Sequence, residues 1–274
     1  MKNQEILIKI VAYIIIIIFC LISFIPFITG LITAFKPETI QIHSPPIWIF
    51  EPTLSNYDRI LFTKGNLYNL MNSFIVTLIN IIISLVVGIP AAYALARFNL
   101  KGSGALLSWI ISLRMIPPVV VAIPFFSLAQ SFNLYDTYIG LTLSYMCFSI
   151  PMVIWIMRGF CVEIPKELEE SAMMDGCSRL YAIYKIVLPL MLPGIVATTL
   201  LVVMVIWNEY LIALILTGRE AQTLPVSTAR FITRVRIEWG SLFAANSLIV
   251  IPILILAISI QKHLVRGLTF GTIK

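Results

Sequence analysis

Long apolar runs separated by short polar segments make up most of the chain. A helix of about 20 apolar residues is long enough to cross about 30 Å of hydrocarbon. Six runs meet this length and are predicted to be transmembrane helices, at residues 8–30, 73–95, 105–129, 138–157, 188–216 and 242–262. The pattern predicts an all-α integral membrane protein, with a single transmembrane domain over residues 1–274.

The first run and the segment after it indicate an uncleaved anchor followed by an ordered loop. Lys2 and Lys9 precede the run as in a signal peptide, but its apolar core is too long and lacks a small-x-small cleavage site. Residues 35–69 then carry prolines, aromatic side chains and charges at a density typical of loops. We expect an external loop or short helices there.

Prolines lie inside several predicted spans, where they remove backbone hydrogen bonds and favour kinks. Membrane helices tolerate them where neighbouring groups or water satisfy the freed carbonyls. Kinked helices around a cavity fit a moving transporter better than a rigid anchor. The prolines are Pro90, Pro117, Pro118, Pro124, Pro151, Pro193 and Pro252.

The polar segment ELEESAMMDGCSRLYAIYKIVLPL, residues 167–190, predicts a helix, a turn and a second helix between the fourth and fifth spans. Pro165 suits a first helical position, and the glutamates that follow are favoured by the helix dipole. Asp175-Gly176 is predicted to end the helix, because glycine adopts the left-handed conformation at little cost. An acidic helix is repelled by an anionic leaflet, so docking into a protein cleft is favoured over lipid binding.

Composition supports a membrane location and argues against several other classes. The chain is 59% hydrophobic and 12% charged, which is too little polar surface for an ordinary soluble domain. Its net charge is +6, and such a basic excess in a membrane protein usually comes from loops that face anionic lipid. The charge is therefore poor evidence for nucleic-acid binding. The four cysteines form no C-x-x-C pair, so neither a disulfide framework nor a zinc site is indicated.

The distribution of lysine and arginine favours cytoplasmic N- and C-termini. With the N-terminus inside, eleven basic residues lie on the inner side and seven on the outer side, and Arg114 lies within a span. The inner set is Lys2, Lys9, Arg97, Lys101, Arg158, Lys166, Arg179, Lys185, Lys262, Arg266 and Lys274. The segment between spans four and five is then cytoplasmic.

No enzymatic motif is found in the sequence. The only histidines are His43 and His263, which cannot form a paired metal site or a histidine dyad within one segment. No glycine is followed by lysine, so the chain has no P-loop of its own. We expect a non-catalytic chain that binds no cofactor or metal directly, and any energy must come from a partner.

The segment EESAMMDGCSRLYAIYKIVLP resembles the EAA loop of ABC importer permeases, and the loop is placed at residues 161–187. Glu170, Ser171 and Ala172 correspond to the Glu-Ala-Ala pattern, Gly176 to its glycine, and residues 186–189 to its Ile-x-Leu-Pro ending. The stretches WNEYLIALILT, TLPV and HLVRGLTFGTIK resemble the second permease of carbohydrate importers of the maltose and glycerol-phosphate type. Ser171, Cys177 and Ile183 are small departures from the pattern.

The resemblance implies a six-helix half of a translocation pore with a cytoplasmic coupling helix between spans four and five. It implies that this chain lies in the prokaryotic inner membrane, together with a sister permease. It also implies two ATP-binding subunits, which bind ATP and magnesium, and an external sugar-binding protein. The residues expected to dock on an ATPase subunit are Glu167, Glu170, Ser171, Ala172, Met173, Asp175 and Gly176. Two alternatives are a secondary transporter or channel subunit for a small polar solute, and a structural anchor.

Polar and aromatic residues in the spans are candidates for the substrate pathway. Arg114 lies near the middle of a span and is expected to face a cavity, Glu209 or a carboxylate of the sister subunit. A residue group near the outer part of the fifth span suits either sugar binding or an interfacial belt. That group is Trp207, Asn208, Glu209 and Tyr210, with Asn80 and Tyr145 as weaker candidates.

Overall fold

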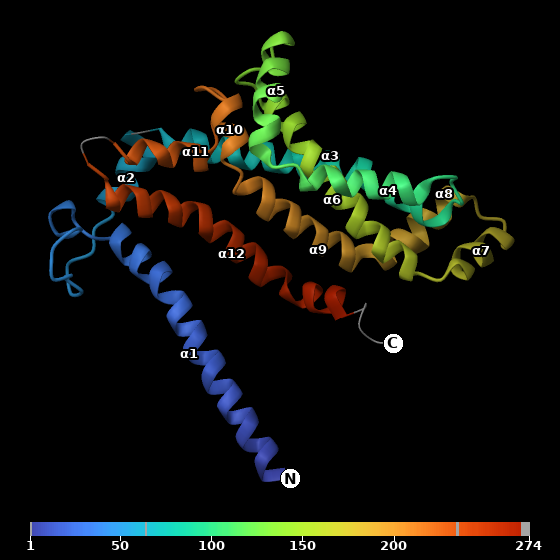
Figure 1. Cartoon of the computed structure of the whole chain (residues 1–274), viewed down its shortest axis with the longest axis horizontal. Coiled ribbons are helices and arrows are strands. Elements are labelled where there is room, and N and C mark those ends of the chain that lie inside the picture. Colours follow the sequence, from blue (N-terminus) through green and yellow to red (C-terminus); the bar gives the residue numbers. More distant parts are fainter. Residues whose placement is uncertain (1, 64, 234–235, 270–274) are drawn as a thin grey trace. The chain divides into compact units, whose positions relative to one another are not determined.

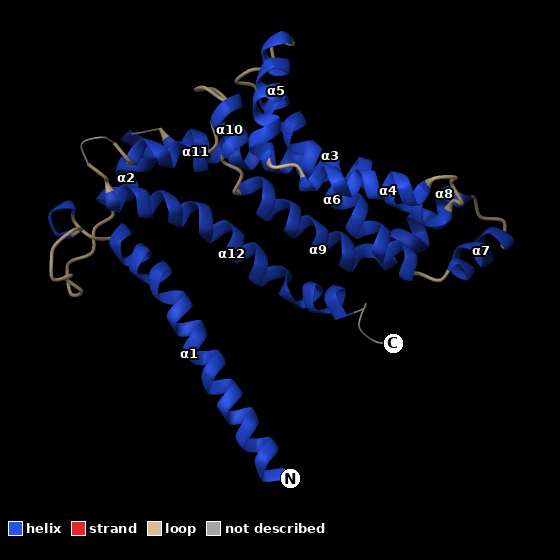
Figure 2. Ribbon diagram, viewed as in Figure 1, coloured by secondary structure: helices blue, strands red, loops and turns tan. Residues whose placement is uncertain are grey.

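A computed structural model describes residues 2–63, 65–233 and 236–269, and Figure 1 follows the order of its helices. Within these ranges the regular secondary structure is helical apart from a single antiparallel bridge between Ile232 and Ile237, and loops and turns connect the helices (Figure 2). The α-helices are α1 (Lys2–Ala34), α2 (Ser55–Asp58), α3 (Asn66–Arg97), α4 (Ser103–Ser112), α5 (Pro118–Ser131), α6 (Tyr138–Glu163), α7 (Lys166–Met174), α8 (Arg179–Ala182), α9 (Leu188–Trp207), α10 (Leu211–Leu216), α11 (Leu224–Thr228) and α12 (Trp239–Thr269). The predicted all-α fold class is confirmed.

Five of the described helices are long and apolar enough to cross a membrane, and a bent pair makes a sixth span if it is counted as one. The bent pair is α4 with α5, at 92°, so the span expected at residues 105–129 is not one straight helix. Pro117 and Pro118 cause the break, because a residue before proline is driven out of the helical region. Ile116 accordingly has ψ 120°, and Pro118 begins α5.

The span expected at residues 188–216 is also interrupted. Helix α9 ends at Trp207 and α10 begins at Leu211, with Asn208 in a non-helical conformation between them. The preceding turn, Ile183–Val187, is a π-helix that leads from α8 into α9. Both interruptions leave backbone N–H or C=O groups without helical hydrogen bonds. Membrane helices tolerate such breaks where side chains or water supply the missing partners.

The described residues form two compact units. The first extends to Leu67 and includes Thr228–Leu248, and the second comprises Tyr68–Ser227 and the residues from Ile249 onward. The single membrane domain over residues 1–274 therefore stays a prediction. Lys64, Arg234 and Lys274, which entered the charge count, lie outside the described residues, as does the end of the tail motif at 270–274.

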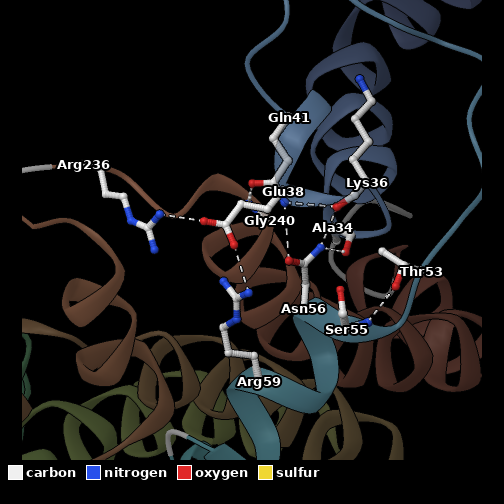
Figure 3. A network of polar contacts seen from close by, with 10 residues as sticks. All are labelled: Ala34, Lys36, Glu38, Gln41, Thr53, Ser55, Asn56, Arg59, Arg236 and Gly240. Atoms are coloured by element: carbon white, nitrogen blue, oxygen red, sulfur yellow. Dashed lines mark hydrogen bonds and ion pairs between the residues drawn. The ribbon is translucent and has the colours of Figure 1, made fainter.

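The first unit contains the expected ordered loop after α1. Its small apolar core consists of Ala34, Ile60, Phe231, Ala244 and Ala245. The buried amide of Asn56 donates to the carbonyl oxygens of Ala34 at 2.8 Å and Lys36 at 2.9 Å, which ties α2 to the end of α1 (Figure 3). Short helical turns at Glu38–Ile40 and Arg59–Thr63 complete this segment. The prediction of short helices in this loop is confirmed.

An exposed ion cluster lies beside this loop. The Glu38 carboxylate accepts hydrogen bonds from Arg59 at 2.9 Å and from Arg236 at 2.6 Å (Figure 3). The hydrogen bond from Arg59 is the main reason that the pKa of Glu38 lies below its ordinary value. Since the charges are open to solvent, such pairs contribute little to stability.

Close helix packing builds the core of the second unit around α3, α6 and α9. A Cβ atom added at Gly88 of α3 would lie 2.5 Å from Val153 of α6, and one at Gly194 of α9 would lie 2.5 Å from the Phe160 ring. Small residues at such positions let membrane helices approach closely and gain van der Waals contact. The packing places the ends of α3 and α6 next to α7.

A polar tie joins two loops of the second unit. Asp136, between α5 and α6, has φ 56°, and its carboxylate accepts four backbone N–H groups at 2.8–3.0 Å. The donors are Gly218, Arg219, Glu220 and Ala221. Burial raises the pKa of Asp136, but the four backbone donors together lower it by more than burial raises it. This pKa therefore lies below its ordinary value.

We expect Asp136→Ala to lower the thermal midpoint of the purified protein at pH 7. The loss is about 1.5–3 kcal/mol of unfolding free energy, which is what a hydrogen bond to a charged group contributes. Because the folded pKa lies below the ordinary value of 3.8, this stabilisation is present above that pH and is lost as pH falls through the folded pKa. Thermal unfolding against pH measures the difference, with the exposed Asp58→Ala as control, and equal midpoints at pH 7 for Asp136→Ala and wild type would contradict it.

Candidate functional site: the α7–α8 hairpin

Helix α7 is delimited by local backbone chemistry. Pro165 at its N-cap has φ −57°, ψ 131°, and Glu167 and Glu169 lie in its first turn, where the helix dipole favours negative charge. The helix closes at Gly176, whose φ is +86°. The Gly176 N–H donates to Met173 and the Cys177 N–H donates to Ala172, each at 3.1 Å. This is the Schellman pattern, and the predicted helix and glycine turn are confirmed.

Helix α8 starts directly after the turn. The Ser178 side chain at its N-cap accepts the Tyr181 N–H at 3.3 Å, as expected for a capping serine. The guanidinium of Arg179 lies 5.0 Å from the centre of the Phe98 ring, which follows α3. The hairpin therefore returns the chain to the end of α3 before α9 begins.

The two sides of α7 differ in exposure. Glu167, Glu170, Ser171 and Met174 are exposed and recur three or four residues apart, so they share one face of the helix. Met174 is 88% exposed, and Leu168 beside this face is 44% exposed. Ala172 and Met173 are half-buried, whereas Asp175 and Gly176 are exposed. Of the seven expected docking residues, three lie on this open face of the helix, namely Glu167, Glu170 and Ser171.

Glu169 is a functional candidate that the sequence reasoning missed. Its carboxylate is buried and forms an ion pair with Arg97 at 2.6 Å and accepts a hydrogen bond from the Tyr93 hydroxyl at 2.6 Å. At 3.6 residues per turn, Glu169 lies about 200° around the helix from Glu167. That rotation is a signal that the three glutamates do not share one face.

The candidate pathway residues around the break between α9 and α10 have different environments. Trp207 is 3% exposed, its indole N–H donates to the Ile249 carbonyl at 2.9 Å, and its ring meets Phe74 edge-on. The ring is therefore packed inside the second unit rather than in an interfacial belt. Asn208 and Tyr210 are exposed, and the Asn208 amide donates to the Met204 carbonyl at 2.8 Å.

Glu209 caps the short helix α10. Its carboxylate accepts the N–H groups of Ile212 at 2.9 Å and Ala213 at 3.0 Å, which are otherwise unsatisfied at a helix start. Among the described residues no ion pair joins Arg114 to Glu209, so that version of the expected pairing is wrong. Arg114 is exposed in the 3₁₀ turn Leu113–Met115, at the bend before α5. A carboxylate of a sister subunit as its partner stays a prediction.

Asn80 and Tyr145 belong to a buried polar seam between α3 and α6. The Asn80 amide donates to the Thr142 carbonyl at 3.3 Å, and the hydroxyls of Ser84 and Ser149 lie 2.7 Å apart. Tyr145 is 1% exposed and lies near Glu209, and its buried hydroxyl has no hydrogen-bond partner among the described residues. The structure therefore gathers Asn80, Tyr145 and Glu209 within the second unit, whereas Arg114 lies apart from this seam in the exposed turn.

Residues 84–270 match the family described as binding-protein-dependent transport system inner membrane component, and this region is more than half of the 274 residues. The chain belongs to this family. The resemblance of its EAA segment to ABC importer permeases is thereby confirmed, and the matched region includes α7, the glycine turn and α8.

This inner membrane component has close relatives among permeases. It is 36% identical over 258 residues to a probable ABC transporter permease protein of Sinorhizobium fredii, with 93% of each chain covered. It is 35% identical over 244 residues to the diacetylchitobiose uptake system permease protein DasC of Streptomyces coelicolor, with 88% of each chain covered.

The fold of this inner membrane component is also that of a solved transporter chain. The match is to a bacterial ABC transporter involved in the import of the acidic polysaccharide alginate, with a TM-score of 0.77 and 24% sequence identity. It covers 94% of this chain and 97% of that chain. At this identity the likeness shows that the two chains share a fold.

Proposed function

We propose that this permease forms half of the translocation pore of an ATP-driven sugar importer and that α7 is its coupling helix. The exposed face of α7, with Glu167, Glu170, Ser171 and Met174, carries the proposal. A short acidic helix with exposed apolar side chains at its end suits a groove on a protein partner. The glycine turn holds this face at a fixed angle to α8.

The proposed assembly contains a sister permease, two ATP-binding subunits and an external sugar-binding protein, within the lipid bilayer. ATP and magnesium bind to the partner subunits, and this chain is non-catalytic. The relative named for diacetylchitobiose uptake and the fold match named for alginate import support a carbohydrate as the substrate class. The seam of Asn80, Tyr145 and Glu209 offers the placed polar groups that a sugar path through an apolar interior needs.

The proposed transport mechanism is a movement of α7 that is passed to the membrane-spanning helices. Closure of the ATPase pair displaces α7, and the spans then rock between inward-facing and outward-facing states as rigid bodies. The breaks before α5 and before α10 supply points at which a span can bend. Substrate moves only when both states are visited in turn.

The test is ATPase activity in proteoliposomes that contain this permease with its sister permease and ATPase subunits. We expect hydrolysis to rise when the binding protein and its sugar are added together on the outer side, with uptake of the sugar. A sample without the binding protein is the control. Uptake that proceeds without the ATPase subunits, or that follows an ion gradient, contradicts the proposal and favours a secondary transporter.

The proposed orientation places the N- and C-termini and α7 in the cytoplasm. We expect Lys101→Cys and Lys166→Cys, in a background with the native cysteines replaced by serine, to be labelled only after the membrane is opened. The outer position is Ile49, which is exposed in the loop after α1, and Ile49→Cys is expected to react in intact cells. A membrane-impermeant thiol reagent makes the measurement. Labelling of Lys166→Cys in intact cells would invert the orientation.

A further inference from the structure

We propose that Arg97, Glu169 and Tyr93 form a latch that fixes the coupling helix to α3 and α6, so that movement of α7 reaches the spans. The proposal rests on the proposed docking of α7 on an ATPase subunit. It assigns Arg97 and Glu169 as positioning residues, since they act through the orientation of α7.

One guanidinium joins three elements at the latch. Arg97, the last residue of α3, donates from Nε to Glu169 Oε1 of α7 at 2.6 Å. From Nη2 it donates to the carbonyl oxygen of Ile164, the C-cap of α6, at 2.9 Å. Tyr93, one turn earlier on α3, donates its hydroxyl to Glu169 Oε2 at 2.6 Å. Both carboxylate oxygens and two edges of the guanidinium are therefore engaged.

Burial makes this pair different from the ion cluster at Glu38. The side chains of Arg97 and Glu169 are 5% and 7% exposed, against 33% and 44% for Arg59 and Glu38. A buried charge that loses its partner is left without compensation, whereas an exposed one is solvated. The planar guanidinium also fixes direction as well as distance, which a flexible lysine does not. The latch thus holds α7 in one orientation.

Apart from Glu169, helix α7 buries little of its own length, and it also contacts α8 and the π-helical turn Ile183–Val187. Glu169 is the single buried residue of Lys166–Met174, a segment that the structure describes throughout. The remaining side chains are exposed apart from the half-buried Ala172 and Met173. Because α7 has no fully buried apolar face, the Glu169 carboxylate is its direct link to α3 and to the end of α6, and a force on the exposed side of α7 reaches these helices through it. Without this link, α7 is held on this side only by its partial contacts with α8 and the turn before α9.

The test compares wild type with Arg97→Glu, Glu169→Arg and the double reversal in reconstituted transporters. The readout is sugar transported per ATP hydrolysed, with co-purification of the ATPase subunits measured on the same samples. We expect each single variant to keep its ATPase subunits, because Glu167 and Glu170 are unchanged, and to lose at least tenfold in sugar transported per ATP. The double reversal restores the ion pair and is expected to recover at least fivefold over the single variants.

Two further variants separate positioning from general stability. Arg97→Lys keeps the charge but cannot bond to Glu169 and the Ile164 carbonyl at the same time as a planar guanidinium does. The sugar transported per ATP by this variant should therefore lie between the values for wild type and Arg97→Glu. Arg59→Gln breaks the exposed pair with Glu38 and should leave coupling unchanged. Wild-type coupling in both single reversals overturns the latch. Should the single variants not be recovered from the membrane, wild-type coupling in Arg97→Lys overturns it. ATPase subunits that fail to co-purify with the wild type overturn the docking proposal instead.

Discussion

Glu170→Lys is expected to weaken association of the permease with its ATPase subunits by more than tenfold. Glu170 lies on the exposed face of α7, three residues from Glu167 and about 100° around the helix from the buried Glu169. In a partner groove its carboxylate would accept hydrogen bonds from basic side chains or backbone N–H groups. A charge-assisted bond of this kind contributes about 1.5–3 kcal/mol, and about 1.4 kcal/mol already corresponds to a factor of ten. Lysine also places a positive charge against those donors.

Co-purification of the ATPase subunits in mild detergent and sugar uptake in cells measure the effect. Glu163→Lys is the matched control, because Glu163 is exposed at the end of α6, before the coupling helix begins. It should reduce association far less. Membrane insertion and binding of the external protein should be unaffected in both variants. If both variants retain wild-type uptake and partner recovery, the acids of α7 are only a solvated surface.

Gly176→Val is expected to abolish most sugar uptake while the permease still inserts into the membrane. Gly176 has φ +86°, and an L-residue there costs roughly 1–2 kcal/mol, with a β-branched side chain strained most. No heavy atom lies within 4 Å of an added Cβ, so the effect comes from the backbone and not from a clash. The turn would relax towards negative φ and lose the hydrogen bonds from the N–H groups of residues 176 and 177 to the carbonyls of Met173 and Ala172. This loss would swing α7 away from its docking angle.

Gly176→Asn tests that reasoning, because asparagine tolerates the left-handed conformation far better than valine. It should retain much of the uptake. Gly104→Val is a second control, at an exposed glycine of α4 with open space around an added Cβ and no positive φ. Uptake by Gly176→Val equal to that of wild type would remove the role assigned to the turn.

The local features of this protein could be predicted because their causes lie close together in the chain. The rise of 1.5 Å per residue converts an apolar run directly into a membrane span, so length alone indicated the helices. Pro165, the acidic first turn and Gly176 delimit α7 through neighbouring backbone groups, and the helix and its turn are where the sequence placed them. The spacing of the EAA segment likewise pointed to the permease family.

The positions that decide the site depend on partners far along the chain. Glu169 faces inward because Arg97 and Tyr93, more than seventy residues earlier, meet it at the end of α3. Trp207 is inside because its indole N–H reaches Ile249, and Glu209 caps α10 rather than pairing with Arg114. Hydropathy and propensity act within about one or two helical turns, so they do not specify which distant side chains meet. Only close packing of α3, α6 and α9 brought Arg97 to α7 and divided its glutamates between a buried ion pair and an exposed face.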